Sequence, residues 1–213
     1  MSRNPLIHIP GGIYSVVSKC NNDEFHFNAD DKFNFYLIHL LTCKKKLGFE
    51  LYDIVCMSNH VHELYRVPQN VTISQILQLV KGRFAWKYNL RYHRRHHFWQ
   101  NKPFYRIVED EQYAFCLMNY FHWNPVKAGM VDHPAKWPYS GYRFHILGAR
   151  EGILGKLLSP LPELDVSGAI VTMSPEMMIE IHAILSNHKV RFIGTTSYRH
   201  RMKRRYKPGA LEA

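Results

Sequence analysis

The order of strand-like and helix-like segments is the feature that most constrains the fold of this chain. Segments rich in β-branched and aromatic residues alternate with segments whose apolar residues recur every three or four positions, which is typical of strands and helices respectively. Strands are predicted at residues 11–20, 49–58, 60–67 and 104–108. Helices are predicted at residues 30–47, 71–93 and 111–123. The order along the chain is therefore β-α-β-β-α-β, followed by one further helix.

Local signals support these segments. Gly48 is a natural end for the first helix, and Ser58-Asn59 favours a tight turn between the second and third strands. One face of the second helix is apolar; its residues are Ile73, Ile76, Leu77, Val80 and Phe84. A β-α-β-β-α-β order is the ferredoxin-like plan, so we expect an α+β fold with an antiparallel sheet and an added last helix.

The last third of the chain differs from the rest. Gly and Pro punctuate residues 152–168, and Ser174-Pro175-Glu176 is a good helix start. The terminus, SYRHRMKRRYKPGALEA, is strongly basic. We therefore predict a main domain at residues 1–148 and a small C-terminal extension at residues 149–213, with a partly disordered tail.

The cysteines and the lengths of the apolar segments indicate the cellular compartment in which the protein is expected. Cys20, Cys43, Cys56 and Cys116 include no C-x-x-C pair, which argues against a zinc knuckle and favours buried, reduced thiols. The N-terminus lacks the apolar run of a signal peptide, and no segment approaches the ~20 apolar residues of a membrane helix. A soluble, cytoplasmic protein without a membrane partner is expected.

Net charge gives the first indication of a partner. Twenty-eight Lys and Arg residues face 17 Asp and Glu residues, a formal net charge of +11 at pH 7. Such a surface attracts polyanions, of which nucleic acid is the commonest. Charge spread evenly for solubility is the alternative, and charge alone does not separate the two.

The distribution of the basic residues favours nucleic acid. In and after the second predicted helix they are interleaved with Phe84, Trp86, Tyr88 and Tyr92, which suits single-stranded or hairpin DNA because bases stack on aromatic faces while cations hold phosphates. The basic candidates in this region are Lys81, Arg83, Lys87, Arg91, Arg94 and Arg95. The alternative is a helix packed on the sheet with a solvated charged face, which holds for Ile73 to Val80.

The basic terminus supplies a second set of candidates. They are Arg199, Arg201, Lys203, Arg204, Arg205 and Lys207. This set either contacts DNA or is a solvated terminus, and the pattern does not separate these interpretations.

A His-x-His pair lies at the start of the third predicted strand. Residues two apart on a strand point to the same face, so His60 and His62 present two imidazoles side by side. Two imidazoles make half of a metal site. The alternative is a pair of surface or hydrogen-bonded histidines, which two residues alone do not exclude.

Tyr120 and Asn124 form a second candidate pair. Spaced four apart, they share a face if both are helical. A phenol can act as a nucleophile, and an amide oxygen can complete a hard-cation site. Against this, most tyrosines pack, and Asn124 before Pro125 could be the N-cap of a short helix at 125–128. Pro125 also disfavours helical geometry at Asn124.

Six segments together resemble a known family. In order and spacing the chain resembles the REP-associated tyrosine transposases, which belong to the single-tyrosine HUH transposases, over about residues 10–148. The segments are GGIYSVVSK, FELYDIVCMSNHVHELYRV, SQILQLVKGRFAWKYN, FWQ, YFHWNPVKAGMV and WPYSGYRFHILG. The combination of HVH, Trp-Gln and Y-x3-NPVKAG is specific, although no single piece is.

The resemblance implies the roles of four residues. By position, His60, His62 and Asn124 correspond to the ligands of a divalent metal, Mg²⁺ or Mn²⁺, and Tyr120 corresponds to the nucleophile. It also implies that residues 1–148 nick and rejoin single-stranded or hairpin DNA at palindromic sequences through a 5′-phosphotyrosine. No nucleotide-binding glycine loop is visible, so no nucleotide cofactor is expected.

Two positions depart from the family pattern. Ser58 stands where Pro is usual, and Glu63 stands where an apolar residue usually follows the second His. By alternation Glu63 points away from the two imidazoles, so the site is expected to survive.

Three questions stay open at the level of sequence. A non-catalytic nucleic-acid-binding module on the same fold is one alternative function, and a metal-dependent phosphodiesterase without a covalent step is another. Whether the protein is a monomer or a homodimer, and whether Tyr120 serves the histidines of its own chain, is equally open.

Overall fold

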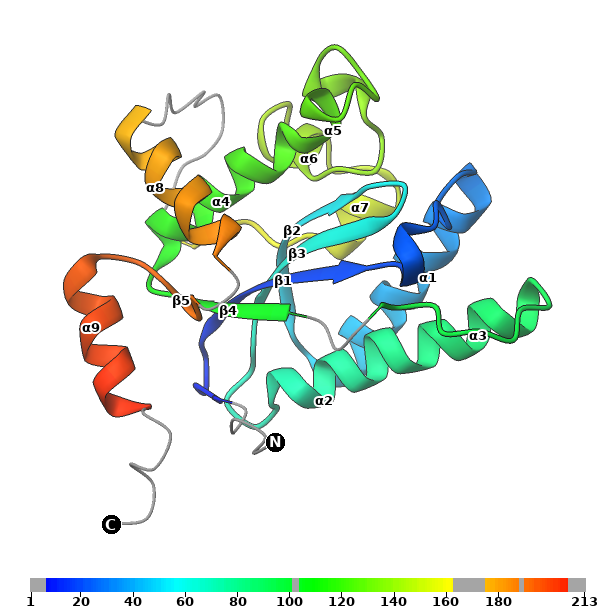
Figure 1. Cartoon of the computed structure of the whole chain (residues 1–213). Coiled ribbons are helices and arrows are strands. Elements are labelled where there is room, and N and C mark those ends of the chain that lie inside the picture. Colours follow the sequence, from blue (N-terminus) through cyan, green and yellow to red (C-terminus); the bar gives the residue numbers. More distant parts are fainter. Residues whose placement is uncertain (1–6, 101–103, 163–174, 188–189, 207–213) are drawn as a thin grey trace.

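A mixed sheet forms the centre of the molecule (Figure 1). The computed structural model describes residues 7–100, 104–162, 175–187 and 190–206, and these form a five-stranded sheet in the order β2-β3-β1-β4-β5. The strands are β1 (Ile13–Lys19), β2 (Glu50–Cys56), β3 (His60–Arg66), β4 (Phe104–Val108) and β5 (Phe192–Ile193). The pairs β2–β3, β3–β1 and β1–β4 are antiparallel, whereas β4 and β5 are parallel.

Helices cover both faces of this sheet. On one face lie α1 (Asp30–Leu47), α2 (Ile73–Leu77) and α3 (Arg83–Arg91), and on the other lie α4 (Glu111–His122) and α8 (Pro175–Ser186). The shorter helices are α5 (Asn124–Lys127), α6 (Tyr142–His145), α7 (Gly152–Leu157), and the 3-10 turns Asn21–Asp23 and Pro134–Lys136. The last helix, α9 (Thr196–Arg205), lies beyond β5 (Figure 1).

Two apolar cores follow from this layering. The larger core joins α1, α2 and α3 to one face of the sheet and is rich in aromatic side chains such as Tyr36 and Phe84, while the smaller core joins α4 and α8 to the other face. Because side chains alternate along β3, Val61, Glu63 and Tyr65 face the larger core. His60 and His62 therefore face α4.

The predicted α+β class and ferredoxin-like order are confirmed. Every predicted strand and helix of the first 123 residues is present, and α1 ends at Gly48 in the left-handed conformation, with φ of 67°. The predicted helix at 71–93 is correct in extent but is not uniform: a π-helical turn, Gln78–Gly82, joins α2 to α3. A capping box between Thr72 and Gln75 starts α2.

The C-terminal residues extend the sheet and pack on its helices. Strand β5 pairs with β4, which makes the sheet mixed and not wholly antiparallel. Helix α7 packs on α1, where Lys44 Nζ donates to the carbonyl of Leu157 at 2.6 Å. Residues 196–205 form α9 and are not a disordered tail, while Lys207 lies outside the described residues. The division of the chain at residue 148 stays a prediction.

The cysteines and the helices agree with the compositional reading. None of the four cysteines forms a disulfide within the described residues, and all four are buried, as expected of small apolar groups. In the part of the chain that the structure describes, no helix has the length and apolar character needed to cross a bilayer.

Candidate active site

Two imidazoles meet on the α4 side of β3. The ring centroids of His60 and His62 are 4.9 Å apart, with the rings nearly perpendicular. Asn59 orients the first ring, because its Oδ1 lies 2.7 Å from His60 Nδ1. Phe121 of α4 packs on the second ring, with centroids 4.7 Å apart. The strand therefore supplies the pair and its neighbours hold the rings.

Both imidazoles are neutral near pH 7. Burial lowers the pKa of His60 to about 4, and the nearby Lys19 adds to the shift. Burial also holds the pKa of His62 well below its usual range, with a further contribution from His60. Neutral rings keep a free lone pair, which is the form that binds a metal ion.

Asn124 joins the helix to the histidine pair. Its Nδ2 lies 3.1 Å from Nε2 of His62. Trp123 has helical φ and ψ angles between α4 and α5, so the chain continues from one helix into the next and Tyr120 and Asn124 stay on consecutive turns. The interpretation of Asn124 as a capping residue is wrong, since it lies within α5 and its side chain contacts His62.

Tyr120 lies in a partly buried position beside a lysine. Lys127 Nζ is 4.2 Å from the centroid of the Tyr120 ring, and the ring of His182 from α8 is 6.3 Å away. Burial raises the pKa of Tyr120 and lowers the pKa of Lys127. The phenol is therefore protonated at neutral pH and needs help to act as a nucleophile. Sequence reasoning missed Lys127, although it lies within the quoted motif NPVKAG.

A second missed residue holds the other side of α4. Asp53 of β2 is fully buried, and its Oδ1 lies 3.1 Å from Nε2 of His122. His145 lies 3.9 Å from the same oxygen and contacts the Tyr52 carbonyl at 2.7 Å. Gly141 packs so closely that a Cβ there would lie 2.0 Å from Asp53 Oδ1. The one available signal was an Asp flanked on both sides by apolar and aromatic residues of a strand.

The residues of this site fit a metal ion only if Asn124 takes part. Among the described residues, no three His, Cys, Asp or Glu side chains are grouped so as to hold a metal. The site offers two neutral imidazoles, and a half-turn of the Asn124 amide presents its oxygen to them. Nδ1 of His62 is buried and has no hydrogen-bond partner, which is an unsatisfied position in the same ring. These three side chains therefore fit a cation that is bound with modest affinity.

Glu63 and Lys81 form a buried ion pair on the opposite face of β3. Lys81 Nζ lies 2.5 Å from Oε2 of Glu63 and also donates to the hydroxyl of Tyr36, which itself donates to Glu63. Lys81 is 3% exposed, so the inclusion of Lys81 among the DNA-binding residues is wrong. The physical reason is the alternation along β3, which turns the unusual Glu63 into the larger core, where a buried carboxylate requires a cation.

The other basic candidates of this region lie at least partly on the surface, whereas most of the aromatic residues interleaved with them do not. Arg83, Arg91 and Arg95 are exposed, Lys87 is half-buried, and Arg94 pairs with Glu24 at 3.0 Å. Of the four interleaved aromatic residues, Phe84 and Tyr88 are core residues and Tyr92 is half-buried with its hydroxyl on Asp31. Trp86, at 64% exposed, is the member of the four that is open to stacking.

The basic residues of the terminus are carried by α9. Arg201, Lys203, Arg204 and Arg205 are all exposed, and Arg199 pairs with Glu180 at 3.0 Å. Arg201 and Arg205 are four apart and line one cavity, whereas Lys203 and Arg204 do not line it.

The fold and the family comparison place the chain in one class of protein. The model of the family described as "Transposase IS200 like" matches residues 11–123, which span β1 to the end of α4, and the chain belongs to this family of transposases. The enzyme class implied by the sequence resemblance is thereby confirmed.

More particular similarities agree with the resemblance to REP-associated tyrosine transposases. A protein of Haemophilus influenzae described as a REP-associated tyrosine transposase is 25% identical over 142 residues, which cover 62% of this chain and 80% of the relative. A solved REP-associated tyrosine transposase, bound to a REP hairpin, superposes with a TM-score of 0.59 at 18% identity. The superposed region covers 81% of this chain and all of the solved chain, which establishes a shared fold.

Proposed function

We propose that this transposase nicks and rejoins single-stranded DNA at palindromic, REP-like sequences through a 5′-phosphotyrosine formed on Tyr120. The observation that carries the proposal is the 3.1 Å contact between Asn124 and His62, because it joins the helix of Tyr120 to the histidine pair of β3. The relatives described as REP-associated transposases support the choice of substrate.

The binding site for a divalent cation is assigned to His60, His62 and Asn124. The low pKa values of the two histidines keep protons from competing for the ring nitrogens near pH 7. Imidazole is softer than the ligands that Mg²⁺ and Mn²⁺ prefer, so these three residues would hold such an ion with modest affinity. An ion bound there would supply Lewis-acid polarisation of the scissile phosphate.

The covalent step exchanges one phosphate ester for another. The oxygen of Tyr120 forms a bond to phosphorus while the bond from phosphorus to the 3′ oxygen breaks; the phenol loses its proton and the 3′ oxygen gains one. In the second step a different 3′-OH attacks the adduct, which rejoins the strand and returns the proton to Tyr120. The number of ester bonds is unchanged, so no nucleotide hydrolysis is needed.

Lys127 assists the first step. Its ammonium lies 4.2 Å from the Tyr120 ring, where a positive charge favours the phenolate over the phenol. Burial opposes this by raising the pKa of Tyr120, so the nearby charge is needed.

Incubation with hairpin-bearing single-stranded DNA and Mn²⁺, followed by denaturing electrophoresis, tests the function. We expect a protein–DNA adduct that both a chelator and Tyr120→Phe abolish. Tyr113→Phe is the matched control, because Tyr113 is a half-buried tyrosine of the same helix two turns away. It should leave the adduct intact.

The same gel separates the two alternative functions. A non-catalytic binding module would leave the DNA at its full length on the denaturing gel, with neither cleavage nor an adduct. A phosphodiesterase that uses His60 and His62 alone would cut without an adduct and would survive Tyr120→Phe.

A further inference from the structure

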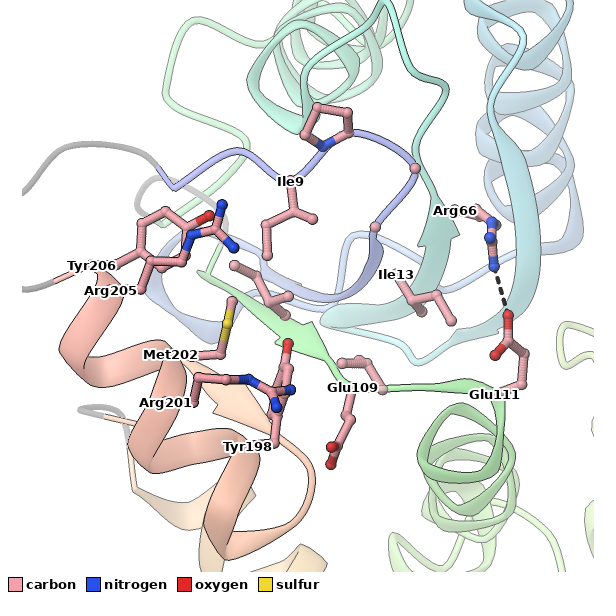
Figure 2. A pocket seen from close by; sticks show the side chains of 15 residues that line it. Ile9, Ile13, Arg66, Glu109, Glu111, Tyr198, Arg201, Met202, Arg205 and Tyr206 are labelled. Carbon is pink, nitrogen blue, oxygen red and sulfur yellow. Dashed lines mark hydrogen bonds and ion pairs between the residues drawn. The ribbon is translucent and has the colours of Figure 1, made fainter.

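A cavity of about 390 Å³ lies at the end of the sheet opposite to the histidine pair. It is open on one side and is lined by the N-terminal residues Ile9–Ile13, by the ends of β3 and β4, and by α9 (Figure 2). This volume is in the range of pockets that take small organic groups. The residues assigned to catalysis do not line it.

The charges of the cavity are unbalanced. Glu111 is bound by Arg66 at 2.6 Å, and Glu109 accepts from the backbone N–H and the hydroxyl of Thr195. Arg201 and Arg205 line the same cavity, and within the described part of the chain neither forms an ion pair. Arg66 compensates Glu111, while Glu109 keeps its negative charge. Three arginines against two glutamates leave one net positive charge in the lining, with the guanidinium groups of Arg201 and Arg205 available to an anion.

The rest of the lining is apolar and aromatic. Ile9, Ile13 and Met202 supply aliphatic surface, and Figure 2 shows Met202 and Arg201 extending from α9 toward the strands. The guanidinium groups lie over tyrosine rings, Arg201 at 5.7 Å from the Tyr198 ring and Arg205 at 5.6 Å from the Tyr206 ring. An apolar floor beside paired cations is the lining that suits a base with its phosphate.

Glycine is required at the turn that forms one wall of the cavity. Gly11 has φ of 68°, and a Cβ at Gly12 would lie 2.9 Å from the carbonyl oxygen of Ile9. The two glycines of the Pro-Gly-Gly sequence therefore line this wall with backbone atoms alone.

The cavity stands at a fixed distance from the candidate active site. Strand β3 begins with His60 and ends with Arg66, so roughly 20 Å separates its two ends at about 3.3 Å per residue. Helix α4 spans the same interval, from Glu111 at the cavity to the turn that carries Tyr120. A strand of DNA held at one end can thus reach the other.

We propose that this cavity binds an unpaired nucleotide of the substrate strand, outside the hairpin, with its phosphate on Arg201 and Arg205 and its base against the apolar floor. The proposal rests on the proposed function for the identity of the strand. It adds a second DNA contact that positions the strand relative to Tyr120.

Two double variants of α9 test this proposal with equal loss of charge. Arg201→Gln with Arg205→Gln removes the cations that line the cavity, and Lys203→Gln with Arg204→Gln removes exposed cations that do not. Affinity is measured for a REP-type hairpin with a short unpaired extension at either end and for the same hairpin without extensions. Circular dichroism verifies that both variants are folded.

We expect wild type to bind the extended hairpin more tightly than the blunt one. Loss of Arg201 and Arg205 should remove that advantage, weaken binding of the extended hairpin by about tenfold or more, and lower its salt slope by about two. The control variant should weaken binding of both hairpins alike and retain the advantage. Equal effects of the two variants, or no advantage in wild type, would overturn the proposal.

Tyr120→Phe in the same assay separates this proposal from the proposed function. Both affinities should survive that substitution while the adduct disappears. An adduct that persists would refute the role of Tyr120 and leave the cavity result standing, whereas failure at Arg201 and Arg205 would leave the chemistry standing.

Discussion

At the scale of single residues, two contacts hold the helical segment 120–124 in place, one made by Asp53 and one by Asn124. Asn124 contacts His62 on one side, and Asp53 binds His122 on the other, at 3.1 Å in each case. Residue 122 lies between Tyr120 and Asn124 in sequence, so the buried carboxylate limits rotation of the segment that carries both.

Replacement of Asp53 should be costly. Asp53→Ala should lower the free energy of unfolding by about 3 to 5 kcal/mol, because it removes one partner of a buried charge-assisted pair and leaves His122 without it. Asp53→Asn should cost less, since an amide oxygen can still meet the ring. Urea denaturation measures both.

An exposed ion pair provides the control for that measurement. Asp132 pairs with Lys136 at 2.7 Å on the surface, where solvent screens the interaction. Asp132→Asn should leave the unfolding midpoint unchanged. Equal effects at Asp53 and Asp132 would refute the assigned role of the buried pair.

The charge of Lys127 should affect the rate of adduct formation. Lys127→Met should slow adduct formation by about tenfold at neutral pH. It should also shift the rising limb of the pH–rate profile to higher pH, because the phenolate loses the adjacent cation. Lys127→Arg should retain most of the rate. Single-turnover kinetics at saturating DNA measures both. An unchanged pH profile in Lys127→Met would contradict the proposal.

At the scale of the element, strand β3 divides its side chains between two tasks. Its alternation places His60 and His62 toward α4 and Glu63 toward Lys81 in the larger core. The same strand thus holds the candidate site on one face and a buried ion pair on the other. Burial lowers the pKa of Lys81, and Glu63 opposes that shift.

Helix α3 should contribute to DNA binding through charges that remain on the surface. Lys87→Gln with Arg91→Gln should make the slope of log affinity against log salt concentration shallower by about two. Each phosphate contact that is lost means that fewer counterions are released from the DNA on binding. Lys136→Gln with Lys156→Gln removes equal charge from exposed positions elsewhere. Titration by fluorescence anisotropy at several salt concentrations measures the slopes. The same slope in both double variants would place the DNA away from α3.

At the scale of the whole molecule, buried neutral histidines make stability depend on pH. Burial lowers the pKa of His26, His39 and His145, the last to about 4. Below the unfolded pKa of about 6.5 the unfolded chain binds more protons than the folded one, so stability falls as the pH decreases from there. For His145 the loss reaches roughly 3 kcal/mol by pH 4 and then levels off.

Urea denaturation between pH 7 and pH 4 tests this dependence. The unfolding midpoint should decrease steadily over that interval. His145→Gln should lower the stability at pH 7 and make the decrease shallower, since one of the contributing groups is gone. A midpoint that is independent of pH in wild type would rule the explanation out.

The sequence by itself determined the elements and the faces of the proposed site. Strand and helix periods are local, so the order β-α-β-β-α-β and the shared face of His60 and His62 were predictable within short windows. The end of α1 at Gly48 was predictable for the same reason, because a left-handed residue is a local requirement.

Only the tertiary structure decided which elements meet. The contact of Asn124 with His62 depends on how α4 packs across the sheet, and sequence reasoning left a capping role for Asn124 open. The sequence analysis predicted Lys81 to be a surface cation that binds DNA. The helical period of residues 71–93 carries no information about Glu63 of β3, which pairs with Lys81 in the core. The parallel strand β5 and the cavity beside α9 arise from segments far apart in sequence. Local geometry is set by neighbours along the chain, whereas pairing across space is set by the packing of the whole molecule.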